Sequence, residues 1–130
     1  MTSPPQFPAA EELYHEGLDQ LAEGDAAGAV HTLRRCLEVD PGMLDAMHGL
    51  IRALQETGDL DAAIATAHRL IELDPDEVLA HTSLSILLQR KGMIAEAEAE
   101  ALRAKLLGWK HQLRQSKRTP QPNPDPTAKQ

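Results

Sequence analysis

Three histidines in this sequence recur at a spacing that could bring their imidazole rings to one metal ion. His15, His48 and His81 are separated by 33 residues each, and a shared site would need about three ligands converging near 2 Å from the ion. The surrounding pattern repeats every 34 residues, so the histidines fall at successive positions of the repeat and point in different directions. We therefore predict no metal site, with His81 filling a seam between helices and the other two histidines partly exposed.

The remaining reactive side chains show no arrangement typical of an active site. Cys36 has no neighbouring His–acid pair to activate it, so it is predicted to fill the core. Glu96, Glu98 and Glu100 alternate on a predicted helix and cannot face one another as a catalytic pair, which indicates a solvated face. The sequence contains no glycine-rich phosphate loop, nucleophile elbow or paired-cysteine metal motif. It predicts a protein that is not an enzyme and holds no cofactor.

Length, charge and cysteine content narrow the class of protein. The chain has 130 residues, which suits one domain, and a formal net charge of -7. Residues 110–130 are basic, so the residues before them must be more acidic than the net charge of the whole chain indicates. This acidic body argues against nucleic-acid binding by that part of the chain. A single cysteine, no secretory signal at the N-terminus and no membrane-length apolar run predict a soluble, cytoplasmic protein.

A 34-residue period organises the chain. Gly24, Gly58 and Gly92 are each 34 residues apart, and so are Pro41 and Pro75, which indicates a repeat architecture. The glycines can end helices, and Asp-Pro pairs break the chain between units. Apolar residues at helical spacing predict helices over residues 9–22, 26–39, 43–57, 60–73 and 76–91, and from 94 to about 116. Residues 1–8 are predicted to be a disordered leader and residues 119–130 a disordered, proline-rich tail.

These features resemble tetratricopeptide repeats, which are helix–turn–helix units of 34 residues. A small residue recurs where the two helices of a unit must touch, at Ala29, Ala63 and Ala97. The resemblance covers residues 10–111, in units of about 10–43, 44–77 and 78–111, with a terminal helix to about residue 117. It implies an all-α domain over residues 9–118, a right-handed superhelical solenoid of three repeats plus a C-terminal capping helix extension.

In this family the first helix of each unit lines a concave groove. The resemblance places apolar side chains at the two ends of that groove and polar ones in its middle. Such a groove would bind a peptide or helix of another protein; alternatively, its apolar members only pack against neighbouring helices. The predicted groove residues are Tyr14, Leu18, Leu21, Asp45, His48, Arg52, Gln55, Leu79, Thr82, Ile86, Gln89 and Arg90.

Some members of the family hold the C-terminal carboxylates of heat-shock chaperones with Lys, Asn and Arg side chains. The corresponding places in this chain carry no cationic donor that could bind a carboxylate. They are occupied by Tyr14, Leu18, Gly49, Leu79 and Ser83. We therefore do not expect that function.

The third unit departs from the other two where Gly108-Trp109 replaces the Asp-Pro break. An apolar stripe continues across this point from Leu102 to Leu113, which predicts a helix extension that caps the stack. The residues assigned to this cap or second contact are Trp109, Leu113, Arg114, Lys117 and Arg118. The first two would cover the open edge of the stack, and the three basic residues would face water. Alternatively, the segment could lie on an anionic membrane or an acidic partner.

The sequence thus predicts a non-catalytic adaptor that binds a peptide or helix of a partner protein in its concave groove. The alternative is a structural or assembly subunit that uses its convex face and its basic C-terminal segment. Such a subunit could assemble with itself or be built into a larger complex, which could be associated with a membrane.

Overall fold

The computed structural model describes residues 9–118 as a helical solenoid. The predicted leader and tail, residues 1–8 and 119–130, lie outside the described residues. The helices are α1 (Ala10–Ala22), α2 (Ala26–Val39), α3 (Leu44–Thr57), α4 (Leu60–Leu73), α5 (Val78–Arg90) and α6 (Ile94–Arg118). Their ends agree with the predicted ends to within two residues. The all-α repeat fold predicted from the sequence is confirmed.

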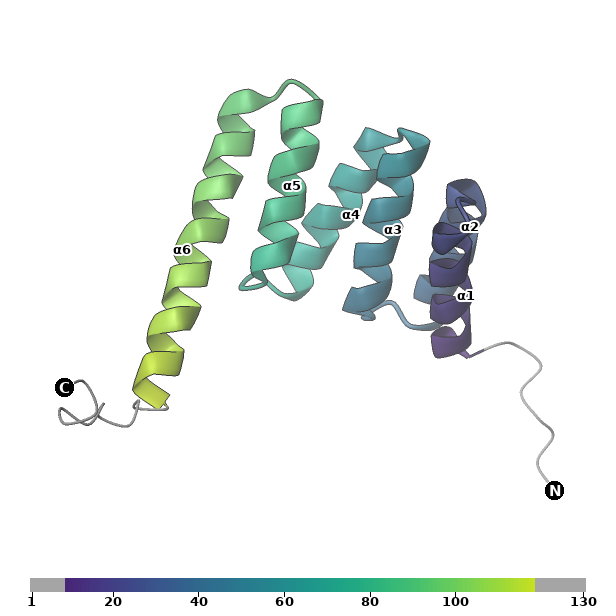
Figure 1. Ribbon diagram of the computed structural model, residues 1–130, viewed down its shortest axis with the longest axis horizontal. Helices are drawn as coiled ribbons and strands as arrows, with labels where there is room; N and C mark the ends of the chain where they lie inside the picture. Colours follow the sequence, from purple (N-terminus) through teal and green to yellow (C-terminus); the bar gives the residue numbers. More distant parts are fainter. Residues whose placement is uncertain (1–8, 119–130) are drawn as a thin grey trace, which may run out of the picture.

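The helices follow one another in a row, so that each packs against the next (Figure 1). The first helices of successive hairpins also touch, because α1 contacts α3 and α3 contacts α5. Among the described residues, the second helices of successive hairpins do not touch, because α2 does not contact α4 and α4 does not contact α6. The closer approach of α1, α3 and α5 places these three helices together on one face of the solenoid.

A glycine forms the turn inside each hairpin, and in the first two hairpins an aspartate follows it. Gly24, Gly58 and Gly92 have φ of 86°, 85° and 86°, a left-handed conformation that glycine adopts without steric cost. The Asp25 carboxylate then accepts a hydrogen bond from the Gly28 amide at 2.9 Å. Asp59 does the same for Ala62 at 3.2 Å. Each aspartate satisfies an amide at the start of the second helix that would otherwise lack a partner.

The same Gly-to-Ala change should have opposite effects at Gly58 and Gly108. A Cβ atom at either position would have open space around it, so only the backbone distinguishes them. Gly58→Ala should lower the free energy of unfolding by about 1 kcal/mol, because an alanine is strained at positive φ. Gly108 lies inside α6, and Gly108→Ala should raise it by about 0.5–1 kcal/mol. Urea unfolding measures both changes, and effects of the same sign would contradict this account.

The interior is made mainly of leucine and alanine. Ala29 and Ala63 are completely buried and Ala97 nearly so, as expected where the two helices of a hairpin touch. Cys36 is also completely buried, and its Sγ donates to the Ala10 carbonyl at 3.1 Å. Burial raises the pKa of the Cys36 thiol, and the nearby Asp40 carboxylate raises it further by a smaller amount. The thiol therefore stays protonated and fills the core, as predicted.

A buried polar cluster joins α5 to α6. His81 is 6 % exposed, and its Nδ1 lies 2.8 Å from Glu100 Oε2. Its Nε2 lies 2.8 Å from the Pro75 carbonyl oxygen, and Arg103 binds the other oxygen of Glu100. The prediction that His81 fills a seam is confirmed. The prediction that Glu100 belongs to a solvated face is wrong, because this carboxylate is buried against His81.

Helix α6 is a single helix that continues through Gly108, runs antiparallel to α5 and extends beyond the start of α5 (Figure 1). Trp109 is 61 % exposed and Leu113 is 50 % exposed. The expectation that these two side chains cover the open edge of the stack is therefore wrong. Because α6 does not bend back over the stack, these side chains have no neighbouring helix to cover.

Candidate functional site

A hollow of about 280 Å³ lies on the face formed by the first helices of the three hairpins. Its lining comes from all three of these helices, so it exists only because the units stack. The residues around it are Tyr14, Leu18 and Leu21 of α1, Asp45, His48, Gly49 and Arg52 of α3, and Leu79 of α5. All of these except Gly49 are among the residues predicted to line the groove.

Apolar side chains from α1 and α5 stand at the two sides of this hollow. Leu21 is buried in the core, whereas Tyr14 and Leu18 are only half-buried and leave part of their surface free. Leu79 is 56 % exposed on the opposite side. The alternative expectation, that Leu18, Leu21 and Ile86 only pack against neighbouring helices, describes Leu21 but not Ile86, which is 46 % exposed.

The middle of the hollow is polar, and its central side chain is held by contact with a glutamate carboxylate. His48 Nε2 contacts Glu77 Oε1, and both side chains are half-buried. Glu77 is the residue immediately before α5, so this contact ties the histidine ring to the start of that helix. Arg52 is mostly exposed and lies 3.8 Å from Glu56 one turn further along α3. The hollow thus offers one positioned imidazole and one flexible guanidinium between two apolar walls.

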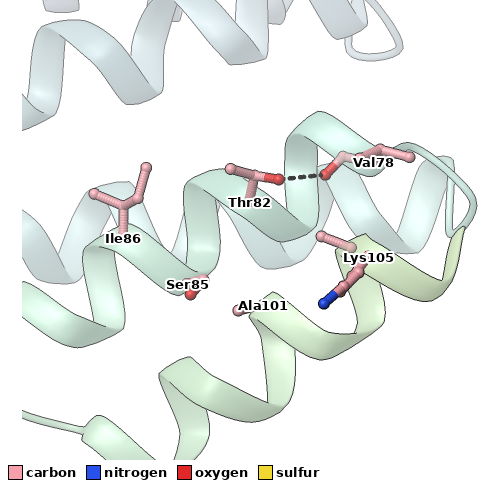
Figure 2. A pocket seen from close by; sticks show the side chains of 7 residues that line it. Val78, Thr82, Ser85, Ile86, Ala101 and Lys105 are labelled. Atoms are coloured by element: carbon pink, nitrogen blue, oxygen red, sulfur yellow. Dashed lines mark hydrogen bonds between the residues drawn. The ribbon is translucent and has the colours of Figure 1, made fainter. Parts of the chain in front are cut away.

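A second hollow, of about 330 Å³, lies between α5 and α6 (Figure 2). It is lined by Val78, Thr82, Ser85, Ile86, Ala101, Ala104 and Lys105. Thr82 Oγ1 donates to the Val78 carbonyl at 3.1 Å, and Ser85 Oγ donates to the Ala97 carbonyl at 2.7 Å. Both hydroxyl protons are thus already used. Ile86 is 46 % exposed, which leaves an apolar side chain and the Lys105 ammonium available at this hollow.

The predicted groove residues fall into three groups in the structure, and the first group is the set that lines the first hollow. Thr82 and Ile86 lie at the second hollow rather than the first. Gln55 is half-buried, and Gln89 and Arg90 are exposed near the end of α5, away from the linings of both hollows.

The residues that α6 contributes to the second hollow were not among the predicted groove residues. They are Ala101, Ala104 and Lys105. The signal that could have identified them is the alanine periodicity of α6, because small side chains leave a recess where a helix packs against its neighbour.

The residues assigned to a cap or second contact lie together on α6. A hollow of about 280 Å³ along this one helix is lined by Leu106, Trp109, Lys110, Leu113, Arg114 and Lys117. Arg118 is the last residue of the helix. This surface belongs to the C-terminal end of the solenoid and is separate from the two hollows described above.

Two further observations concern other classes of function. Within residues 9–118, no group of three or more His, Cys, Asp or Glu side chains is placed so that it could hold a metal ion. In that same range, none of the helices combines the length and the apolar character that crossing a membrane requires.

Solved structures with the same fold include those of MamA and SycD. MamA superposes with a TM-score of 0.76 at 23 % identity, over 79 % of this chain and 60 % of the MamA chain. This chain therefore spans less than two thirds of the MamA structure. SycD, the type III secretion translocator chaperone of Yersinia enterocolitica, gives a TM-score of 0.72 at 26 % identity, over 75 % of this chain and 74 % of its own. SycD has also been solved in complex with a peptide of the translocator YopD.

A third structure is the second repeat domain of Spaghetti (RPAP3), bound to an HSP90 peptide. It superposes with a TM-score of 0.71 at 18 % identity, over 75 % of this chain and 91 % of its own. No curated protein matches the sequence. The family model described as tetratricopeptide repeat matches residues 20–87, more than half of the chain. The chain belongs to the tetratricopeptide repeat family.

Proposed function

We propose that this protein is a non-catalytic adaptor that binds a peptide or helix of another protein on the face formed by α1, α3 and α5. The single observation that carries the proposal is the first hollow, where three helices surround a space with apolar walls and a polar middle. Leu79 and Ile86 add two exposed apolar side chains, seven residues apart on α5. Apolar anchors at helical spacing are what a groove presents to an amphipathic partner.

The relatives support this mode of binding. SycD and the RPAP3 domain, which share this fold, were each solved with a bound peptide. The character of the peptide should nevertheless differ from that of the HSP90 peptide. Of the five places at which family members hold a terminal carboxylate, four are occupied here by residues that line the first hollow, namely Tyr14, Leu18, Gly49 and Leu79, and the fifth is Ser83. An apolar side chain of the partner fits these places better than a carboxylate does, because the guanidinium of this lining belongs to Arg52, which lies outside them.

Peptides selected from an unbiased phage-displayed library against the folded protein provide the test. The selected peptides should carry apolar residues at i and i+3 or i+4. Leu79→Glu/Ile86→Glu should weaken their binding at least about 30-fold, roughly 2 kcal/mol, because two anchors become buried charges. Fluorescence anisotropy measures the affinity, and circular dichroism checks that the variant stays helical.

A matched control comes from the opposite layer of the solenoid. Leu73 of α4 is 52 % exposed, much like the two anchors, but lies at neither hollow of the groove. Leu73→Glu should leave peptide affinity unchanged. The groove proposal is wrong if the peptides tolerate the double change in α5 but lose affinity on the change in α4.

The second candidate function, a subunit of a larger assembly, is favoured by one specific observation. Helix α6 carries four large apolar side chains that are at least half exposed, on its side away from α5.

A further inference from the structure

Helix α6 carries an exposed apolar face on its side away from α5. We call it the outer stripe, and it consists of Ala95, Ala99, Leu102, Leu106, Trp109 and Leu113, all exposed. The opposite side of the helix, with Ala97 and Ala104, is buried against α5. The outer stripe therefore forms the exposed surface at the C-terminal end of the solenoid.

The spacing of the outer stripe indicates what kind of element would cover it. Its residues follow one another at intervals of 4, 3, 4, 3 and 4. This alternation is the seam of a coiled coil, in which apolar side chains of one helix insert between those of another. The seam runs from Ala95 to Leu113, which is about 27 Å at 1.5 Å per residue. A single partner helix of similar length fits it.

The charges beside the outer stripe identify that helix. Glu96 and Glu98 flank its first part, whereas Lys105, Lys110 and Lys117 flank its second part. A second copy of α6 running antiparallel sets the acidic part of each helix beside the basic part of the other. A parallel copy would set the lysines beside one another, which is unfavourable. The surface is thus self-complementary, as a two-fold symmetric contact requires.

We propose that two copies of this chain associate through the outer stripes of α6, packed antiparallel. In this register Leu102 of one copy lies beside Leu106 of the other, and Ala95 lies beside Leu113. This contact does not depend on peptide binding in the groove. Because it involves a single pair of helices, the interface is small and the expected dissociation constant is in the range of about 1–100 μM.

Other occupants are less well matched to the outer stripe. Residues 119–130 contain no Val, Ile, Leu, Met or aromatic residue, and their four prolines do not favour a helix that could pack along the seam. An anionic membrane would attract the lysines of the second part. It would repel Glu96 and Glu98, which flank the same stripe.

The first experiment measures the mass of the full chain by sedimentation equilibrium from about 1 to about 300 μM, a range that brackets the expected dissociation constant. The mass should rise from 14.2 kDa toward twice that value. Leu106→Glu/Trp109→Glu, whose targets are exposed, should stay monomeric and fully helical over the same range. Leu73→Glu, an equally exposed leucine on α4, should dimerise like the unaltered chain. A monomeric unaltered protein, or a dimer that survives the double change, overturns the proposal.

The orientation of the two helices is tested by disulfide formation. Ala95→Cys and Leu113→Cys are made in separate chains, and the native Cys36 is buried and does not compete. Under mild oxidation, a mixture of the two variants should cross-link, and neither variant should cross-link with itself. Efficient self-linking of Ala95→Cys would show a parallel contact and overturn the antiparallel arrangement.

Vesicles of phosphatidylserine and phosphatidylcholine separate the dimer from a membrane contact. The unaltered chain should stay in the supernatant when such vesicles are sedimented. Sedimentation with the vesicles that is abolished by Leu106→Glu/Trp109→Glu, in a chain that is monomeric in solution, would assign the outer stripe to a membrane instead. The affinity of groove-bound peptides should be unchanged by this double change, so loss of the dimer and loss of peptide binding are distinguishable.

Discussion

His81→Leu is expected to lower the free energy of unfolding by about 3 kcal/mol, because it leaves a buried carboxylate without its main partner. The Glu100 side chain is 9 % exposed, and His81 Nδ1 contacts its Oε2 at 2.8 Å. The other ring nitrogen meets the Pro75 carbonyl, so the same substitution removes two hydrogen bonds at once. Arg103 still contacts Glu100, but its side chain is mostly exposed and shields the charge only partly. Urea unfolding followed by circular dichroism measures the change.

The double variant His81→Leu/Glu100→Leu isolates the cause of this loss. It removes both members of the buried pair and replaces them with apolar side chains, a change that is often close to neutral. We expect it to recover at least half of the stability lost in the single variant. Equal losses in the single and double variants would show that the shape of His81 matters and its pairing with Glu100 does not.

The helices could be predicted closely because their ends are set by local chemistry. Gly58 and its two equivalents adopt a backbone that stops one helix, and Asp25 and Asp59 cap the next. The start of α5 was predicted two residues early, because Glu77 is still extended and precedes the first helical turn. The end of α6 was predicted about two residues early, since nothing local stops it at Ser116.

The first hollow could be anticipated because the repeat sets which side of each helix faces inward. Tyr14, His48 and Leu79 are on different helices, and the resemblance placed all three in one groove, where the structure brings them around one space. The α6 side of the second hollow was not anticipated. Reading a groove from the first helix of each unit omits Lys105, which lies on the second helix of the last unit.

For two side chains the predicted exposure to solvent was wrong, and the reasons were opposite. Glu100 was assigned to water because it is charged, although Thr32, its equivalent two repeats earlier, is buried. That equivalence was the available signal of an inward position. Trp109 was assigned to a covered edge because it is apolar, although an apolar side chain is buried only where a neighbouring element exists. Whether α6 bends or continues is decided by packing, and the sequence of α6 alone does not determine it.

The first two units fill the same space between their two helices with one large and one small side chain, but the positions of the two are exchanged. In the first unit Leu33 is completely buried, and an added Cβ on Gly17 would lie 2.6 Å from its Cδ2. Thirty-four residues later the equivalents of Gly17 and Leu33 are Ile51 and Ala67, both buried. The large side chain thus comes from the second helix of the first unit and from the first helix of the second unit. The first two units thus keep one large and one small side chain at this contact, whereas the third unit has two small ones, Ser85 and Ala101, which line the second hollow.

Leu33→Ala is therefore expected to lower the free energy of unfolding by about 3–5 kcal/mol, because it leaves a cavity between α1, α2 and α3. Gly17→Ile alone should cost about 3 kcal/mol by overpacking against the same leucine. Gly17→Ile/Leu33→Ala reproduces the solution of the second unit, so its loss should be smaller than the sum of the single losses by at least about 2 kcal/mol. Urea unfolding of the four proteins measures this coupling.

Leu33→Ala/Gly108→Ala provides the matched comparison for this exchange. Gly108 lies in α6, and a Cβ there meets no atom within 4 Å, so the two effects should add to within about 0.5 kcal/mol. Additivity in both pairs would mean that Gly17 and Leu33 do not share one space. Coupling between Gly17 and Leu33 only would show that the first two units tolerate different sequences because both keep the total volume at this junction. That constraint acts on pairs of residues, and for this reason either residue taken alone can vary from one unit to the next without loss of the stack.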